Sequence, residues 1–499
     1  MAVPDLSARL LPDEAEDIQG IARTGFGTLK HACFLLLRIV DAPAARAWLA
    51  GADVALAARR DDTTASALQI ALTARGLRAL GLPAPVLQGF SAEFLSGMAG
   101  DAGRSRRLGD VGANAPSAWR WGGAEEPDVL VMLYAPNDPA QWRQHVETQS
   151  FARGFAIQQS LVATDMGGRE PFGFADGISQ PRVDWAGARN PSAAQELAYT
   201  NLIAPGEFLL GYKNEYGLYT DRPLLAGDAP GADTLPVAAE RPGWRDLGRN
   251  GSYLVFRELH QDVRRFWDFM REQAGADAVA LAEMMVGRRM DGAPMAEAST
   301  GPIPGVGPKD DEIKRNLFTY DADAMGVRCP IGAHVRRANP RTADLPGGAQ
   351  SAVARLMRIL GFCKPDLRED LVAASRFHRI LRRGRPFGAA PAELAAATDV
   401  ASGLYFICLN ANIPRQFEFI QNAWMHNAKF AGLSGEGDPV TGNREPFPPG
   451  QATDGFGMPG QNGVQRRIEG LPPFVTVRGG AYFFLPGLRA LRFIASQTE

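Results

Sequence analysis

The 499-residue chain contains only four cysteines, Cys33, Cys329, Cys363 and Cys408. They lie far apart, form no Cys-x-x-Cys pair, and stand in or beside apolar stretches. This pattern argues against a disulfide framework and a cysteine-rich zinc site, and it predicts sparse buried thiols. A single bond between two of them stays open, but the sequence does not require it.

Histidine is also scarce. The six histidines are His31, His145, His260, His334, His378 and His426, and no two have the close spacing of a zinc-binding pair. The sequence therefore argues against a zinc site built from protein side chains. A cofactor that needs only one histidine ligand is still compatible with this composition.

The chain has little net charge and no long apolar run. Its 53 basic and 55 acidic residues give a formal charge of -2, which argues against nucleic acid or an anionic membrane as a partner. No stretch reaches the length of a membrane span, and the first residues lack a basic start, an apolar core and a twin-arginine pair. We therefore expect a cytoplasmic location.

The length and an internal echo indicate two domains. A chain of 499 residues exceeds one ordinary core. The segments Phe34–Leu49 and Tyr253–Asp268 both read as an apolar strand, a short polar break and a helix that carries a tryptophan. Two copies of this start favour duplicated α+β domains, although chance similarity is an alternative because such strand–helix pairs are common.

Further patterns complete the expected fold. We predict a strand and a helix in 66–82, a strand in 128–136 with a helix from near 138, and later strands in 403–412 and 474–486. This order fits a split βαβ, ferredoxin-like arrangement. A Gly-, Pro- and Asp-rich region, 205–250, reads as loops with a short hairpin that join the halves. We therefore expect domains over 1–204 and 205–499.

The stretch Pro171–Arg182, PFGFADGISQPR, places Asp176 before a glycine. Asp-Gly is a common hairpin-turn pair, so a turn aspartate is one interpretation. The other is a carboxylate held over an open metal position. There it would take a proton from one peroxide oxygen and return it to the other.

Two later islands supply a histidine and arginines. His334 follows the small residues CPIGA, which let a flat ring approach the backbone, and Arg336, Arg337 and Arg341 follow as partners for carboxylates. A structural histidine beside a solvated basic loop is the alternative. Arg382 follows an apolar pair in RILRRGRPFG, where a strand end would direct it into a pocket, or it belongs to a surface charge run.

The strand expected at Gly403–Leu409 would place Leu404 and Phe406 on one face. These side chains would either cap a haem face or pack in an ordinary core. Together the carboxylate, the histidine and the arginine form a minimal set for binding haem iron and splitting peroxide.

These segments resemble the dye-decolorizing peroxidases. GFADGISQP matches the GxxDG signature of that family, AHVRRANPR is similar to its axial-histidine segment, and HRILRRGRPFG is similar to its distal-arginine segment. Gly403–Trp424 and Phe474–Pro486 also resemble family segments. The likeness runs from near His31 to the C-terminal end, and the long segment 344–375 marks one of the larger, elaborated members.

The resemblance implies two ferredoxin-like domains and a haem b held mainly by the C-terminal half. His334 would be the axial ligand, Asp176 the acid–base carboxylate and Arg382 the distal arginine. A ligand histidine needs an acceptor on its other ring nitrogen, for which Asn412 and Glu418 are candidates. The further haem contacts that we expect are Gly177, Ile178, Arg336, Arg341, Leu404 and Phe406.

The resemblance also implies a function. We expect a peroxidase that uses hydrogen peroxide to oxidise phenolic or dye-like donors in one-electron steps through a ferryl state, as a monomer or a homodimer. Some members carry an asparagine two residues after the distal arginine. Here that residue is Gly384, so Asp176 would do more of the proton transfer. A non-catalytic haem carrier or iron-releasing protein is the alternative, followed by an α+β barrel that binds another anion.

Overall fold

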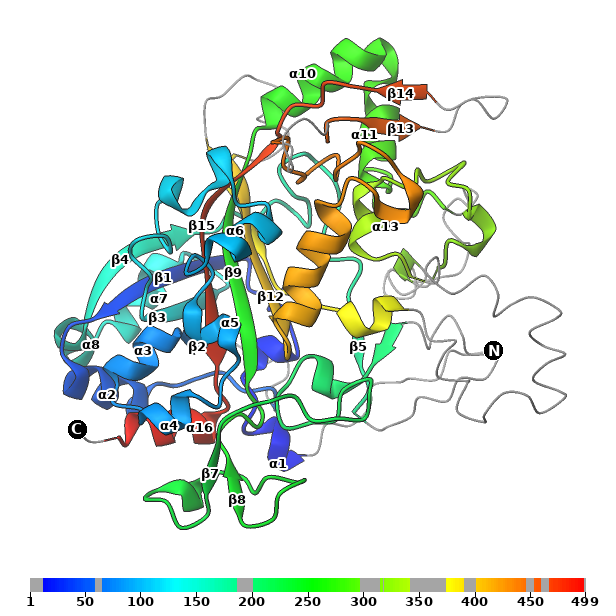
Figure 1. The fold of residues 1–499 in the computed structure, drawn as a ribbon. Coiled ribbons are helices and arrows are strands. Elements are labelled where there is room, and N and C mark those ends of the chain that lie inside the picture. Colours follow the sequence, from blue (N-terminus) through cyan, green and yellow to red (C-terminus); the bar gives the residue numbers. More distant parts are fainter. Residues whose placement is uncertain are drawn as a thin grey trace, which may run out of the picture.

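A computed structural model describes residues 12–58, 65–185, 201–296, 315–316, 318–341, 374–389, 401–445, 453–458 and 466–497. Its main feature is an antiparallel sheet in which nine strands of the described residues take part. Helices cover the sheet, and the strands run through the middle of the molecule (Figure 1). The expected α+β class is confirmed.

The first half of the sheet follows the ferredoxin-like order. Its strands lie in the order β2-β3-β1-β4, and all neighbouring pairs are antiparallel. Helices begin at residues whose side chains accept a backbone N–H, such as Asp41 and Thr73. The elements are β1 (His31–Ile39), α2 (Ala42–Gly51), β2 (Ala67–Leu72), α3 (Ala74–Ala79), β3 (Val129–Ala135), α7 (Pro139–Val146) and β4 (Phe155–Val162).

The second half repeats this order. Its strands lie in the order β10-β12-β9-β15, and β11 also pairs with β12. Helix α10 follows β9 as α2 follows β1, so the duplication expected from the sequence is present in the fold. The elements are β9 (Ser252–Gln261), α10 (Val263–Ala274), β10 (Leu381–Arg382), β11 (Arg385–Phe387), β12 (Ser402–Asn410) and β15 (Val475–Leu485).

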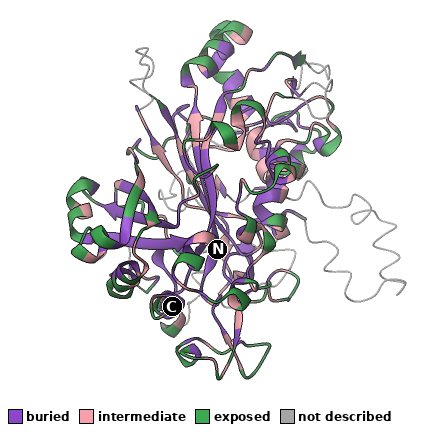
Figure 2. Cartoon of the chain, turned by 60° about the vertical axis from the view of Figure 1, so that its left-hand side comes forward, coloured by how far each residue is buried: buried purple, intermediate pink, exposed green. Residues whose placement is uncertain are grey.

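The two halves meet between β15 and β2, where Phe484 pairs with Leu72. Apolar runs such as that of β3, buried at every residue, fill both faces of the sheet. The purple strands of Figure 2 are buried along their length, whereas the helices expose green outer faces. This burial supplies most of the driving force for folding, at about 25 cal/mol per Å² of apolar surface.

The smaller elements complete the fold, and β7 and β8 form the short hairpin expected within 205–250. They are α1 (Pro12–Ala15), α4 (Ala84–Leu87), α5 (Ala92–Ser96), α6 (Ala102–Leu108), α8 (Gln149–Gly154), β5 (Arg182–Val183), β6 (Leu202–Ile203), β7 (Leu224–Ala226), β8 (Trp244–Asp246), α11 (Ala278–Val286), α13 (His334–Ala338), β13 (Phe456–Met458), β14 (Arg466–Ile468) and α16 (Leu488–Ala495).

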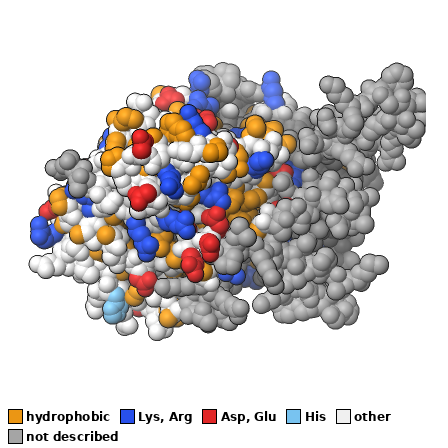
Figure 3. Space-filling view, turned by 90° about the horizontal axis from the view of Figure 1, so that it is seen from below, with side chains coloured by type: hydrophobic (Ala, Val, Ile, Leu, Met, Phe, Trp, Pro, Cys, Tyr) orange, Lys and Arg blue, Asp and Glu red, His pale blue; other side chains and the backbone are white. Residues whose placement is uncertain are grey.

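Three sequence expectations can be compared with the structure here. Cys33, Cys329 and Cys408 are buried free thiols, as predicted, and Cys363 lies outside the described residues. Across the described segments, no helix has the length and apolar character needed to cross a membrane. Basic and acidic side chains are interspersed on the face seen in Figure 3, in keeping with the formal charge near zero.

Candidate active site

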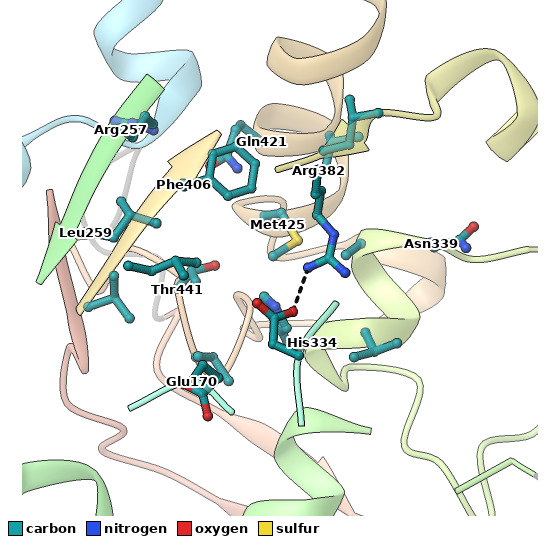
Figure 4. A pocket seen from close by; sticks show the side chains of 18 of the residues that line it. Glu170, Arg257, Leu259, His334, Asn339, Arg382, Phe406, Gln421, Met425 and Thr441 are labelled. Carbon is teal, nitrogen blue, oxygen red and sulfur yellow. Dashed lines mark hydrogen bonds and ion pairs between the residues drawn. The ribbon is translucent and has the colours of Figure 1, made fainter. Parts of the chain in front are cut away.

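A cavity lies against one face of the C-terminal half of the sheet. Alternate residues of a strand point to the same face, so Leu259 of β9 and Leu404 of β12 line the cavity as cross-strand neighbours. Loops and helices close the other sides, as Figure 4 shows. The lining includes Asp176, Gly177, Ile178, His334, Arg382, Leu404 and Phe406, which are seven of the nine residues predicted from the sequence.

His334 is the first residue of α13 and lies at the cavity wall. Its Nδ1 lies 3.0 and 3.1 Å from the two carboxylate oxygens of Asp438, and because a carboxylate only accepts, Nδ1 donates. The Nε2 atom is therefore the ring nitrogen with a free lone pair. The His334 side chain is 28% exposed and that of Asp438 is fully buried, so the histidine alone is accessible from the cavity.

Asp438 is held as a carboxylate. It accepts hydrogen bonds from the backbone N–H groups of Val440 and Thr441 and from the Thr441 hydroxyl. Burial alone would raise its pKa. The charge and hydrogen bond of His334 outweigh burial, so the pKa of Asp438 lies well below its ordinary value. Burial likewise opposes protonation of His334, but Asp438 prevails and raises the pKa of the imidazole.

Asp176 and Arg382 form an ion pair within the cavity. Arg382 Nη1 lies 3.3 Å from Asp176 Oδ1, and both side chains are about one-third exposed. Arg382 is the last residue of β10, as the sequence predicted, and its guanidinium points toward His334 in Figure 4. Asp176 is placed by its own backbone, because its N–H donates to the carbonyl of Gly168.

Glu170 organises the loop that carries Asp176. Its carboxylate accepts from the N–H groups of Phe172 and Phe174 at 3.0 and 2.9 Å, and from Gln261 of β9 at 2.7 Å. These bonds close a turn and attach it to the sheet. Burial, despite these bonds, raises the pKa of Glu170 to about 7. Glu170 was not predicted as a site residue, because the only signal in the sequence is its position shortly before the GxxDG segment.

Apolar side chains from both strand and loop complete the walls near the ion pair. Phe406 lies beside Phe417, with ring centroids 6.2 Å apart. Ile178, two residues after Asp176, also lines the cavity. No side chain fits at Gly384, because a Cβ atom there would lie 2.6 Å from the carbonyl oxygen of Tyr405. The backbone therefore excludes an asparagine at that position, and Asp176 is the carboxylate that pairs with Arg382.

Buried arginines gather at another part of the wall. Arg288 and Arg379 are 5% and 8% exposed, and neither forms an ion pair with a carboxylate among the described residues. Burial, followed by repulsion from Arg341, lowers the pKa of Arg288 to about 10 and that of Arg379 to about 9. Nη2 of Arg288 also lacks a hydrogen-bond partner in the described part of the chain. Such a cluster is suited to bind carboxylates of a ligand.

Two predicted haem contacts do not line the cavity. Arg336 is buried in an ion pair with Asp323 and donates to the carbonyl of Cys329, so its assignment was wrong. Arg341 donates to the carbonyls of Asn316 and Phe318. Arg336 and Arg341 therefore form their contacts with other parts of the protein and not with the cavity.

The two candidate acceptors for His334 were also wrong. Glu418 pairs with Arg104, at 2.9 Å, and Asn412 accepts from the backbone of Arg415. Asp438 takes that role. It lies 104 residues after His334, and no pattern near His334 in the sequence pointed to it.

The donor set of the cavity fits a haem. The His334 imidazole, held by a buried carboxylate, is suited to bind iron through Nε2. The apolar walls suit the faces of a porphyrin, and Arg288 and Arg379 suit its two propionates. No group of three or more metal-ligating side chains exists among the residues described.

No protein-family model matches the chain. The multifunctional dye peroxidase DyP2 of Amycolatopsis sp. is 29% identical over 453 residues, which cover 85% of this chain and 81% of that protein. The dye-decolorizing peroxidase AauDyP1 of Auricularia auricula-judae is 26% identical over 461 residues, with coverage of 85% and 75%.

Solved structures give the same picture. A fungal DyP-type peroxidase from Auricularia auricula-judae superposes with a TM-score of 0.70 at 26% identity, covering 97% of this chain and 99% of that one. A dye-decolorizing peroxidase with a haem pocket engineered for asymmetric sulfoxidation gives 0.71 at 25% identity, with the same coverage. The similarity therefore extends over both halves of the sheet.

Proposed function

We propose that His334, Asp176 and Arg382 carry the reaction of this chain on a b-type haem. The chain is a peroxidase of the dye-decolorizing type, which oxidises phenolic or dye-like donors. The observation that supports these roles is that two pairs of interacting side chains line the same cavity. His334 with Asp438 forms one pair, and Asp176 with Arg382 forms the other.

Asp438 and His334 would hold the cofactor. The hydrogen bond to Asp438 fixes the ring orientation and makes Nε2 the ring nitrogen that would bind the iron. A bound haem would supply a redox-active iron that can store the oxidising equivalents taken from peroxide. Arg288 and Arg379 would neutralise the propionates and relieve their mutual repulsion.

Asp176 and Arg382 would handle the protons and charge of hydrogen peroxide. Asp176 would take a proton from one oxygen of hydrogen peroxide and deliver it to the other oxygen, which leaves as water. Arg382 donates hydrogen bonds to the oxygen on which negative charge develops. Leu404 and Phe406 narrow the space above this pair, so that small oxidants enter and bulky dyes are excluded.

The alternative of a non-catalytic haem carrier or iron-releasing protein is not favoured. A carrier needs His334 and the propionate partners, but it has no use for a carboxylate paired with an arginine inside the same cavity. The relatives named above are peroxidases, which also argues for catalysis.

The test begins with an absorption spectrum of the purified protein, reconstituted with haem b and then mixed with one equivalent of hydrogen peroxide. We expect a Soret band that shifts on addition of peroxide. His334→Ala should lose or loosen haem, whereas Asp176→Asn should keep it and slow the peroxide step about 10²–10⁴-fold. Asp165→Asn, an exposed carboxylate upstream in the chain, is the matched control. A Soret band that peroxide leaves unchanged would favour the carrier.

A further inference from the structure

His378 lies in the same cavity but has no part in the reaction described above. It ends a short 3-10 helix, Ala374–His378, and precedes the strand that carries Arg382. The His378 side chain is half-buried and lines the cavity wall. His334 and His426 line the same cavity, but Nδ1 of His426 already accepts from the backbone N–H of Asn443, so His378 is the histidine whose presence requires a physical explanation.

The orientation of the His378 ring is fixed. Its Nδ1 lies 2.5 Å from the carbonyl oxygen of Arg415, which can only accept, so Nδ1 carries the hydrogen. The ring stacks on Phe419, with centroids 3.6 Å apart and planes 5° from parallel, and Trp424 packs edge-on at 5.3 Å. These contacts leave one tautomer and one orientation, in which Nε2 carries a lone pair.

Nε2 of His378 has no hydrogen-bond partner among the described residues, and it remains a neutral base over a wide pH range. Burial, with a smaller contribution from the charge of Arg415, lowers the pKa of His378 to about 4. The imidazole is therefore unprotonated from mildly acidic to neutral pH, where it can accept a hydrogen bond or a proton.

The other acid–base groups of the cavity each have a partner. Asp176 pairs with Arg382, Asp110 pairs with Arg257 through Oδ1, and Glu170 accepts three hydrogen bonds. Nδ1 of His426 accepts from the backbone N–H of Asn443. The nearby guanidinium groups of Arg379 and Arg382 disfavour a cationic ligand. A molecule that binds beside His378 should therefore be neutral or anionic and should offer a hydrogen-bond donor.

We propose that His378 Nε2 accepts the O–H of a phenolic donor and takes its proton when the donor is oxidised. The phenol gives one electron to the oxidised cofactor and its proton to Nε2, which leaves a neutral phenoxyl radical and an imidazolium. The imidazolium then releases the proton to solvent. This step deepens the proposed function and rests on it, because the electron acceptor is the peroxide-oxidised cofactor. A phenol that keeps its proton is harder to oxidise, so the acceptor matters for phenols alone.

The experiment uses the haem-loaded enzyme and two donors, 2-methoxyphenol and a non-phenolic dye that loses an electron without a proton. His378→Phe keeps a flat ring against Phe419 but removes the acceptor. We expect kcat/KM for the phenol to fall at least about tenfold and the non-phenolic dye to change less than about twofold. Calorimetric titration of 2-methoxyphenol into peroxide-free protein should show an affinity about fivefold or more lower.

Two further variants sharpen the test. His378→Gln offers a carbonyl oxygen that accepts a hydrogen bond but does not take a proton, so it should restore phenol affinity and leave kcat low. His145→Phe, an exposed histidine of α7, is the matched control and should leave both donors unaffected. The solvent deuterium isotope effect on phenol oxidation should differ between the wild type and His378→Gln.

The outcomes separate the possible errors. Unchanged phenol kinetics in His378→Phe would overturn the proposal, and so would loss of haem from that variant, which would make His378 a cofactor contact. An equal fall with both donors would also overturn it. If the wild type oxidised neither donor, the proposed function would fail, whereas the calorimetric affinity for the phenol would still report on the His378 site.

Discussion

Asp438 places a buried negative charge behind the histidine that is suited to bind iron. Because burial keeps water away, the interaction with His334 is not weakened by solvent, and the imidazole takes on anionic character. An electron-rich ligand stabilises iron in its higher oxidation states. This property suits a peroxidase, which must reach such states, better than a protein that carries oxygen or free haem.

The first prediction therefore concerns Asp438→Asn. The variant should keep the fold and bind haem, but with a less negative Fe(III)/Fe(II) potential and an about 10–100-fold lower haem affinity or peroxide rate. Spectroelectrochemical titration of wild type and variant measures the potential. A potential that does not move would show that the carboxylate has no electronic effect on the ligand.

Glu170 gives the loop of Asp176 a dependence on pH. Its pKa is about 7 in the folded protein and about 4.5 in a solvated chain, mainly through burial. Between these values the folded state holds a proton that the unfolded state releases. Stability from this group is therefore greatest at low pH and is lost as pH rises toward 7.

The second prediction follows from this decrease of stability with rising pH. The free energy of unfolding of the haem-free protein should fall between pH 5 and pH 8, and Glu170→Gln should lack a part of this fall on the order of 2 kcal/mol. Urea denaturation at both pH values measures the difference. Asp165→Asn, exposed to solvent, should behave as wild type does. An identical pH dependence in Glu170→Gln would contradict the assignment.

Single site residues could be predicted from the sequence where they lie within a recognisable sequence motif. Asp176, His334 and Arg382 each lie within such a segment, and all three line the cavity. Asp438 escaped because its partner is 104 residues away, and contacts over that separation leave no local pattern. Arg336 was assigned to the cofactor because a basic run does not reveal which carboxylate each member meets.

Among the elements, α6 and the two π-helical turns η13 (Pro414–Glu418) and η14 (Ile420–Met425) connect the halves of the molecule. Glu418 lies 2.9 Å from Arg104 of α6 and accepts from the hydroxyl of Tyr482 on β15, also at 2.9 Å. Arg104 and Glu418 are almost fully buried. A buried pair contributes little by itself, but loss of one member leaves the other charge unpaired.

The third prediction concerns this connection. Glu418→Ala should lower the free energy of unfolding by about 3–5 kcal/mol, because Arg104 would stay buried without its partner. The double variant Glu418→Ala with Arg104→Met should recover much of that loss. Thermal denaturation of the two variants gives the comparison, and equal losses in both would show that the charge pairing is not the cause.

The strands in the interior of the sheet were predictable because both of their faces are apolar. Strand β4 was not identified from the sequence, because it lies at the edge of the sheet. It pairs only with β1 among the strands of the sheet, and its burial alternates irregularly, with Ile157 and Val162 exposed. An edge strand with polar residues such as Gln158 and Gln159 lacks the continuous apolar run that marks its neighbours.

At the scale of the whole molecule, the two ferredoxin-like halves share one sheet, and both contribute to the cavity. Gly109 and Asp176 come from the first half, and His334 and Arg382 come from the second. We propose that the division between them lies at residues 204 and 205, at the start of the loop-rich region. The sequence suggested this duplication, but joining through β15 and β2 needs contacts that no local pattern encodes.

The fourth prediction follows from the shared sheet. Calorimetry of the haem-loaded protein should show one unfolding transition, because separation of the halves would expose β15, β2 and the cavity together. Removal of the haem should lower Tm, since a ligand bound only by the folded state stabilises it. Two separate transitions in the loaded protein would argue that the halves unfold independently.

The place of β15 in the sheet has a consequence for biosynthesis. This strand lies between β9 and β2, it lines the cavity through Val475 and Val477, and it follows every other strand along the chain. On the ribosome, each half can begin to fold as it emerges. The sheet cannot join β9 to β2, and the cavity lacks the side chains of β15, until residues 475–485 have been translated. Haem acquisition is therefore expected only after this segment leaves the exit tunnel, and a chain truncated before it should be released without cofactor.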